Sequence, residues 1–158
     1  MKKHEAALLA TATVGGALVA GSTQGPQHLR SGLWYAWLRK PSYTPPGPVF
    51  GIAWTVLGGF LGYSGYRLLI ARSKPARTGA LWAWALSALG IAAYPWSFFG
   101  RRTLVESTGV AGAMLAATTA LAVKAGDVDR SAARAAWPLV AWTCFAFLLS
   151  EEIARRNR

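Results

Sequence analysis

Residues 33–66 read LWYAWLRKPSYTPPGPVFGIAWTVLGGFLGYSGY. An aromatic patch opens this stretch, a basic pair at Arg39 and Lys40 follows, and a proline-rich segment over residues 41–48 leads into a long apolar run. Tryptophan and tyrosine favour the boundary between hydrocarbon and lipid headgroups, where arginine and lysine can keep their charges in water. Proline suits the first turn of a helix, because its missing N–H would have no partner there. The pattern predicts a structured aqueous loop over residues 25–47 that delivers the chain into the bilayer.

The composition is typical of a membrane protein. The length of 158 residues suggests a single domain over residues 1–158, 53% of the residues are hydrophobic, and several long runs contain no charge. The 17 Lys and Arg residues give a net charge of +11, which could suggest nucleic-acid binding. They fall mainly between or beside the apolar runs, however, so we expect no nucleic-acid partner. Cys144 is the only cysteine, which excludes an intrachain disulfide and a multi-cysteine metal site.

Five apolar runs predict five transmembrane helices. Their approximate bounds are residues 6–23, 48–69, 79–99, 104–123 and 132–153, with a short polar turn expected over residues 73–78. None of the runs alternates with a period of two, which argues against a β-barrel. The predicted fold class is therefore an all-α, multi-pass integral membrane protein, built as a five-transmembrane-helix bundle.

The first run has a second interpretation. Its uncharged part, residues 6–20, would span only about 22 Å as a helix, and a basic start before an apolar centre also fits a secretory signal peptide. Five spans place the two termini on opposite sides of the membrane. The loops on the N-terminal side then carry 9 Lys and Arg residues and those on the other side carry 8, so the positive-inside rule does not fix the orientation.

Two features of the predicted spans have structural explanations. Gly58 and Gly62 form a GxxxG pattern with Gly65 nearby, which permits close helix contact in lipid. Packing within one bundle and dimerisation both fit this pattern. Glu106 is the one acidic residue near the body of a span, and Arg102 lies four residues earlier. We expect these two side chains to form an ion pair at the membrane interface.

Residues suited to ordinary catalysis are few. His4 and His28 are the only histidines, and neither lies in the body of a predicted span. There is no His/Glu cluster with metal-ligand spacing and no Gly-rich phosphate loop, so we predict neither a metal site nor a cofactor, and hydrolytic catalysis is not expected. The aromatic residues are more informative. Trp54, Tyr94 and Trp142 lie in three different predicted spans, where they could face a common cavity or the lipid.

Several short motifs, in order along the chain, carry a resemblance to a known family. They are Trp34-Tyr35, Lys40-Pro41-Ser42, Thr44-Pro45-Pro46 and Trp54, then Pro95 with Phe98-Phe99-Gly100, then Pro138 with Ala141-Trp142 and Phe145. Over residues 30–150 the chain resembles the translocator protein family (TspO, the peripheral-type benzodiazepine receptor family). Tyr43 stands where tryptophan is commoner in that family. The family retains its first helix, which favours a span over residues 6–23.

The resemblance implies a homodimer with a ligand pocket among the five helices, covered by the loop between the first two. The ligand-binding residues that carry over are Tyr43, Phe50, Trp54, Tyr94, Trp142, Phe145, Ala146 and Leu149. Two positions depart from the family: Ile91 stands where it usually has asparagine, and Leu139 stands where it usually has tyrosine. Both changes remove polar groups, so a ligand is expected to depend more on shape and stacking.

The function that the resemblance implies is a membrane receptor- or transporter-like protein that binds hydrophobic planar ligands, chiefly tetrapyrroles such as protoporphyrin IX. One alternative is an enzyme that degrades porphyrin with light and oxygen, in which Trp54 and Trp142 would be catalytic. Another is a regulatory membrane protein that acts through a protein partner. The sterol pattern proposed for animal members keeps its flanks but lacks its tyrosine in residues 149–155, so we expect sterol binding to be weak.

Overall fold

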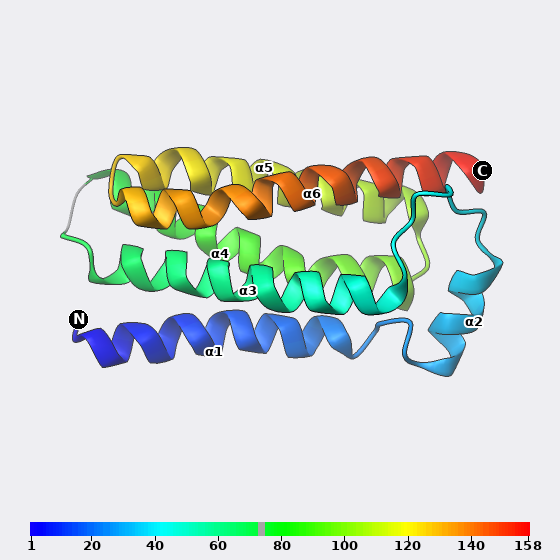
Figure 1. The fold of residues 1–158 in the computed structure, drawn as a ribbon, viewed down its shortest axis with the longest axis horizontal. Helices are drawn as coiled ribbons and strands as arrows, with labels where there is room; N and C mark the ends of the chain where they lie inside the picture. Colours follow the sequence, from blue (N-terminus) through cyan, green and yellow to red (C-terminus); the bar gives the residue numbers. More distant parts are fainter. Residues whose placement is uncertain (73–74) are drawn as a thin grey trace.

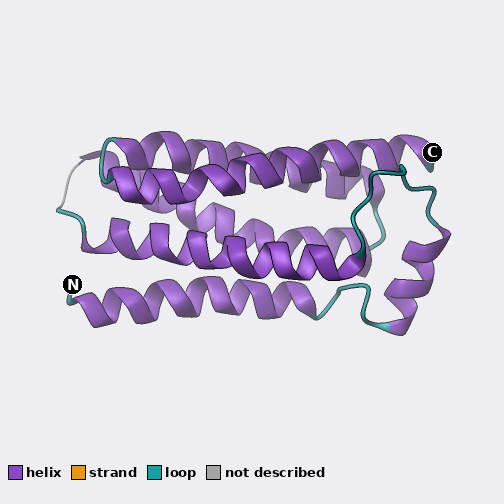
Figure 2. Ribbon diagram, in the orientation of Figure 1, coloured by secondary structure: helices purple, strands orange, loops and turns teal. Residues whose placement is uncertain are grey.

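The computed structural model describes residues 1–72 and 75–158. These residues form helices and connecting loops, with no strand among them (Figure 2). In chain order the elements are α1 (Lys3–Ser22), α2 (Leu29–Trp37), α3 (Gly47–Ile70), α4 (Pro75–Pro95), the π-helix η1 (Trp96–Gly100), α5 (Leu104–Gly126) and α6 (Arg130–Arg156). The prediction of an all-α protein is confirmed.

The five long helices run side by side, and the short α2 lies at one end of them (Figure 1). Successive long helices run in opposite directions, so the two termini lie at opposite ends. α1 packs against α3 and α4, and α3 also packs against α6. α5 packs against both α4 and α6. We call the end that carries α2 the loop end, and the opposite end, where α5 turns into α6, the turn end.

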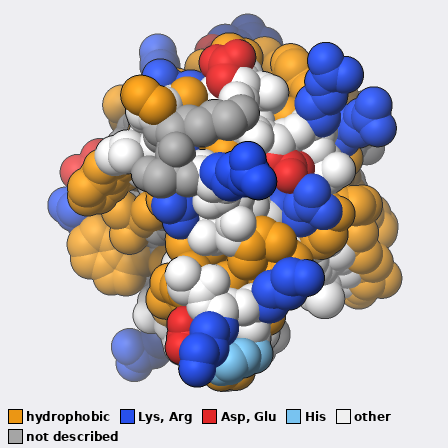
Figure 3. Space-filling model, turned by 90° about the vertical axis from the view of Figure 1, so that its left-hand side faces the viewer, with side chains coloured by type: hydrophobic (Ala, Val, Ile, Leu, Met, Phe, Trp, Pro, Cys, Tyr) orange, Lys and Arg blue, Asp and Glu red, His pale blue; other side chains and the backbone are white. Residues whose placement is uncertain are grey.

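Three of the long helices, α1, α5 and α6, are long and apolar enough to cross a membrane. α3 and α4 have similar lengths, 24 and 21 residues, but they are rich in Gly, Trp and Tyr, which add little to a hydropathy sum. Figure 3 views the turn end: Lys and Arg side chains lie over the helix ends, and hydrophobic side chains spread over the flanks. This distribution fits an end in water and sides in hydrocarbon.

The expected loop over residues 25–47 contains a helix that the sequence pattern did not indicate. The rings of Trp34 and Tyr35 on α2 meet those of Phe98 and Phe99 on η1 edge to face, with centroids between 5.4 and 6.4 Å apart. A helix of only 9 residues is marginal by itself, and this aromatic packing is what stabilises it.

α4 begins inside the expected turn over residues 73–78. Ser73 and Lys74 lie outside the described residues, and the helix starts at Pro75. Arg77 in its first turn donates hydrogen bonds of 2.8 Å to the carbonyls of Leu68 and Leu69. These carbonyls belong to the last turn of α3, where they have no partner within the helix. The arginine therefore ties the end of α3 to the start of α4.

The prediction that Glu106 pairs with Arg102 is wrong. α5 begins at Leu104, so Arg102 precedes the helix; it has a φ of 58°, and its side chain donates to the Arg30 carbonyl at 3.4 Å. Glu106 forms its ion pair with Arg101, at 3.3 Å. A spacing of four residues brings two charges together only when both lie on the same helix.

The glycines of α3 allow close packing inside the bundle. A Cβ added to Gly58 would lie 2.7 Å from the Cδ1 atom of Leu18 on α1. One added to Gly65 would overlap the indole of Trp84 on α4, whereas at Gly62 it would meet nothing within 4 Å. Of the two explanations for the glycine pattern, packing within the bundle therefore accounts for Gly58 and Gly65, and Gly62 does not take part.

Asp129 closes the turn end of the bundle. Its carboxylate accepts a 2.9 Å hydrogen bond from the Ala132 amide, as the N-cap of α6, and forms a 2.6 Å ion pair with Arg67 of α3. Burial tends to raise the pKa of this carboxyl, but the hydrogen bonds from Arg67 and Ala132 outweigh it, and the pKa lies below its ordinary value. The ionised carboxylate thus joins α3 to the start of α6.

Asp129→Asn is expected to keep the helix cap and lose the ion pair, whereas Asp129→Ala loses both. The free energy of unfolding of the alanine variant should therefore be about 0.5–2 kcal/mol lower than that of the asparagine variant. Because the pKa of the Asp129 carboxyl is lower in the folded protein than in the unfolded chain, the ion pair stabilises the fold at pH values above the ordinary pKa of 3.8. That stabilisation is lost as the pH falls through the pKa of the folded protein. Thermal unfolding in detergent, at neutral and acid pH, measures both effects. A wild-type advantage over Asp129→Asn that persists unchanged in acid would contradict this assignment.

Candidate ligand-binding cavity

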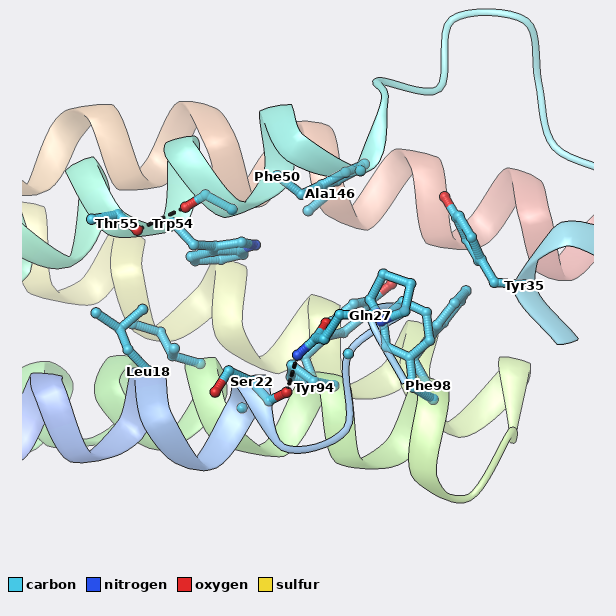
Figure 4. A pocket seen from close by; sticks show the side chains of 18 of the residues that line it. Leu18, Ser22, Gln27, Tyr35, Phe50, Trp54, Thr55, Tyr94, Phe98 and Ala146 are labelled. Atoms are coloured by element: carbon cyan, nitrogen blue, oxygen red, sulfur yellow. Dashed lines mark hydrogen bonds between the residues drawn. The ribbon is translucent and has the colours of Figure 1, made fainter. Parts of the chain in front are cut away.

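A cavity of about 520 Å³ lies inside the bundle at its loop end (Figure 4). α1, α3, α4, η1 and α6 form its walls, together with α2 and the segment that follows α1. The lining residues are Leu18, Val19, Gly21, Ser22, Gly25, Pro26, Gln27, Tyr35, Gly47, Phe50, Gly51, Trp54, Thr55, Gly90, Ile91, Tyr94, Pro95, Phe98, Phe99, Ala146, Leu149 and Ile153. A concave, mostly apolar cavity with a few polar groups is the usual form of a small-molecule site.

Aromatic side chains from facing helices dominate the lining. Phe50 and Trp54 come from the first turns of α3, and Tyr94 and Phe98 come from α4 and η1. The rings of Tyr94 and Phe98 stack, with centroids 5.6 Å apart and planes 20° apart. The Tyr94 hydroxyl hydrogen-bonds to the Ser150 hydroxyl of α6 at 2.5 Å, so it is already engaged. The lining therefore presents ring faces and edges more than free polar atoms.

The aromatic wall depends on a change of helix type after Pro95. The Arg101 amide donates to the Trp96 carbonyl at 2.9 Å, which is the five-residue spacing of a π-helix. Phe98 and Phe99 lie in this wider turn, and both line the cavity while also contacting α2. Short π-helical segments occur often at functional sites.

Five of the eight expected ligand-binding residues line the cavity. They are Phe50, Trp54, Tyr94, Ala146 and Leu149. Ile91, which stands where the family usually has asparagine, also lines it and is buried. Its apolar side chain removes a hydrogen-bonding group from the wall, which agrees with a site that depends on shape and stacking.

The other three expected residues lie elsewhere. The Trp142 ring is behind the lining, with centroid distances of 5.8 Å to Phe50 and 6.3 Å to Trp54, and Phe145 lies 5.5 Å from it. Trp142 and Phe145 therefore support two of the cavity's aromatic residues from outside the lining. Tyr43, between α2 and α3, is 55% exposed and is not part of the lining.

Sequence reasoning did not identify the α1 wall or the segment after it. Leu18, Val19 and Ser22 line the cavity, and the Gln27 side chain extends into it and donates its amide to the Ser22 carbonyl (Figure 4). α1 is apolar all round, so its sequence carried no signal for one face over another. The only available signal was Gln27 itself, a neutral polar residue beside Pro26 in a segment expected to cover a pocket.

The rim of the cavity includes exposed residues of both α1 and α3. Val19 on α1 and Gly51 and Thr55 on α3 line it, and all three are also exposed. Ser22, Pro26, Gln27 and Gly47, nearer the loop end, line the cavity and are exposed as well, so the exposed rim runs from the flank of the bundle to the covering segment.

Hydrogen bonds hold the covering segment at the loop end. The Lys40 ammonium donates to the carbonyls of Tyr35 and Leu38, at 2.6 and 3.1 Å, and lies 4.6 Å from the centre of the Tyr35 ring. Asn157, after α6, both accepts from the Arg39 amide at 2.9 Å and donates to its carbonyl at 3.0 Å. Burial raises the pKa of the Tyr35 phenol, so it stays neutral beside the cavity.

The described part of the chain contains no group of three His, Cys, Asp or Glu side chains close enough to hold a metal ion. The polar side chains that line the cavity are Ser22, Gln27, Tyr35, Thr55 and Tyr94. The lining can therefore bury apolar area and stack against a flat ligand, while forming few hydrogen bonds with it.

Comparison with known proteins agrees with this arrangement. The chain is 34% identical to the human translocator protein over 140 residues, which cover 78% of this chain and 75% of that protein. It is 31% identical to the sheep translocator protein over 152 residues, 87% of this chain and 84% of the relative. It is 29% identical to the tryptophan-rich protein TspO of Bacillus cereus over 126 residues, 78% of this chain and 80% of the relative. A model of the TspO/MBR family matches residues 7–156, so the chain belongs to the TspO/MBR family of integral membrane proteins.

Proposed function

We propose that this protein binds flat hydrophobic ligands, above all tetrapyrroles such as protoporphyrin IX, in the cavity at the loop end. Membership of the TspO/MBR family supports a receptor- or transporter-like role in a membrane. The observation that carries the ligand proposal is the cavity of about 520 Å³, whose walls carry six aromatic side chains and whose polar side chains are few. A tetrapyrrole is flat and apolar over most of its area, and such a ligand gains affinity from ring contacts and area burial.

Charge at the loop end supports the same ligand class. Lys40 holds a positive charge against the Tyr35 ring that lines the cavity, and Arg102 lies over Trp34 with its guanidinium carbon 5.9 Å from the ring centre. The carboxylates of a porphyrin would meet these cations at the covering segment while its ring system stays among the aromatic walls. We do not extend the proposal to sterols, because Glu151 and Glu152 occupy the stretch where an aromatic would contact a sterol.

We also propose that all five long helices cross the membrane within a single domain, and that the protein forms a homodimer. The opposite positions of the termini and the length of α3 and α4 support five spans. Reporter proteins fused to the two ends should report opposite sides of the membrane. Reporters on one side would show an even number of spans.

Titration of the purified protein in detergent with protoporphyrin IX and with cholesterol tests the ligand class. We expect protoporphyrin IX to quench tryptophan fluorescence at a lower concentration than the concentration at which cholesterol changes that fluorescence. Trp54→Leu should weaken porphyrin binding about 3- to 12-fold, because it removes an aromatic contact worth about 0.5–1.5 kcal/mol beyond area burial. Trp142→Leu should weaken it less, because Trp142 contacts Trp54 and does not line the cavity. Submicromolar cholesterol binding, or equal effects of the two variants, would contradict the proposal.

A second candidate function is light-dependent degradation of the bound porphyrin. The favouring observation is the edge-to-face contact of Trp54, in the lining, with Trp142 behind it, at 6.3 Å. When one of two adjacent indoles is oxidised, the radical can pass to the other. Phenylalanine side chains are not easily oxidised in this way. The Trp142 indole nitrogen is buried without a hydrogen-bond partner among the described residues, so Trp142→Phe removes an unsatisfied donor and should be tolerated. Illumination of the wild-type complex in air should leave the porphyrin spectrum unchanged if the protein only binds. A new stable product, absent from Trp54→Phe/Trp142→Phe and from free porphyrin, would establish the enzyme.

A further inference from the structure

A second hollow lies on the outer face of the bundle between α3 and α6. It is a shallow depression, open along its length, and shares no lining residue with the ligand cavity. We call it the α3/α6 groove; its lining residues are Val56, Gly59, Phe60, Tyr63, Ser131, Arg134 and Ala135. The two helices run antiparallel here, with the end of α3 beside the start of α6 (Figure 1).

The groove is polar at one end and apolar along its floor. Tyr63, Ser131 and Arg134 lie toward the turn end, near the end of α3 at Ile70 and the start of α6 at Arg130. From Tyr63 the groove continues toward Val56, seven residues earlier on α3, which is about 10 Å along a helix. A polar group at the membrane surface followed by an apolar strip parallel to the helices matches one lipid molecule in a bilayer.

Arg134 supplies an uncompensated positive charge to this polar end. It is exposed, and it forms neither an ion pair nor a hydrogen bond with any other residue that the structure describes. Two other basic residues at this end are engaged within the protein: Arg67 is paired with Asp129, and Arg77 donates to two carbonyls. An arginine one turn inside a membrane helix extends its guanidinium to the headgroup region, where phosphates are its natural partners.

The floor of the groove has room for a chain of methylene groups. A Cβ added to Gly59 would meet nothing within 4 Å, and Val56 and Phe60 on either side are 54% and 41% exposed. The test below separates a lipid from a second copy of the protein as the occupant of this face.

We propose that the α3/α6 groove binds one anionic phospholipid. One of its two acyl chains lies along Val56, Gly59 and Phe60, and its headgroup phosphate contacts Arg134, with the Tyr63 hydroxyl as a hydrogen-bond donor. Basic sites between transmembrane helices at a membrane surface are a general mode of recognition for anionic headgroups. This binding is independent of the ligand proposed for the cavity at the loop end.

The test uses the full chain in detergent with equal amounts of phosphatidylglycerol and phosphatidylcholine that carry the same acyl chains. Native mass spectrometry reports which lipid stays bound, and it reports the oligomeric state in the same spectra. The wild type should retain phosphatidylglycerol in preference. Arg134→Gln should reduce that preference about five-fold, the effect of one basic residue near an anionic headgroup. Gly59→Leu should reduce binding of both lipids, because its side chain fills the floor.

Two variants serve as controls. Lys3→Gln removes a positive charge from the same end but from α1, and Gly109→Leu adds the same side chain at an exposed position of α5, where a Cβ also meets nothing within 4 Å. Both should retain lipid as the wild type does. The proposal is overturned if the wild type shows no preference, or if Arg134→Gln matches Lys3→Gln. It is also overturned if Gly59→Leu converts a dimer to monomers without changing lipid binding, because the groove would then be an interface between copies.

Discussion

Gly65→Ala is expected to lower the free energy of unfolding by about 1–3 kcal/mol, the usual cost of overpacking a filled core. The added methyl group would overlap the indole of Trp84. That indole cannot easily move away, because it is only 6% exposed and donates a 3.0 Å hydrogen bond to the Leu61 carbonyl. Displacing it would leave a buried N–H without an acceptor and separate α3 from α4.

Gly62→Ala, one turn earlier on the same helix, is the matched control. Its methyl group meets nothing within 4 Å, so the variant should be as stable as the wild type or more stable by up to about 1 kcal/mol through better helix propensity. Thermal unfolding of both variants in the same detergent gives the comparison. Equal stabilities would show that α3 and α4 do not approach each other as closely as Gly65 and Trp84 indicate.

The bounds of α3 were predictable from the sequence because both of its ends have a clear physical signal, whereas α4 begins four residues before its expected start. α3 was expected over residues 48–69 and runs from Gly47 to Ile70, with Pro48 in its first turn and Arg67 in its last. Proline tolerates the start of a helix, and a basic residue near the end reaches the interface. The short α2 gave no such signal, because its stability comes from rings of η1 that lie more than 60 residues later in the chain.

The pocket was predictable only in part. Phe50, Trp54, Tyr94, Ala146 and Leu149 came from family resemblance, and the structure places them on one cavity. Whether a residue faces the cavity or lies behind its lining depends on the rotation of its helix about the helix axis. Matching of sequence motifs does not report that rotation. The α1 residues and Gln27 carried no motif at all, and they depend on how α1 packs against α3 and α4. Their role as ligand contacts, like that of the expected residues, stays a prediction.

Gly51→Leu and Ala146→Leu, at lining positions on two neighbouring helices, are each expected to weaken protoporphyrin IX binding about 10- to 200-fold. Gly51 lies on α3 and Ala146 on α6, and both line the cavity. A Cβ on Gly51 meets nothing within 4 Å, so a leucine there projects into open space and leaves the bundle intact. A ligand that fills the cavity must then be displaced or deformed, and one excess methylene group in an apolar pocket already costs about 1–3 kcal/mol.

Gly59→Leu separates occupation of this cavity from a general effect of a larger side chain. It adds the same side chain to the same helix at a position equally free of neighbours, but in the α3/α6 groove, and it should leave porphyrin binding unchanged. Tryptophan quenching titrations of the three variants, with thermal unfolding as the check on folding, give the comparison. If both cavity variants bind porphyrin as the wild type does, the ligand lies on another surface. If Gly59→Leu weakens binding as much as Gly51→Leu, the tetrapyrrole contacts the lipid-facing side of α3. A loss confined to Gly51→Leu and Ala146→Leu requires a ligand that contacts α3 and α6 at the same time, and the cavity at the loop end is where these two helices share a lining.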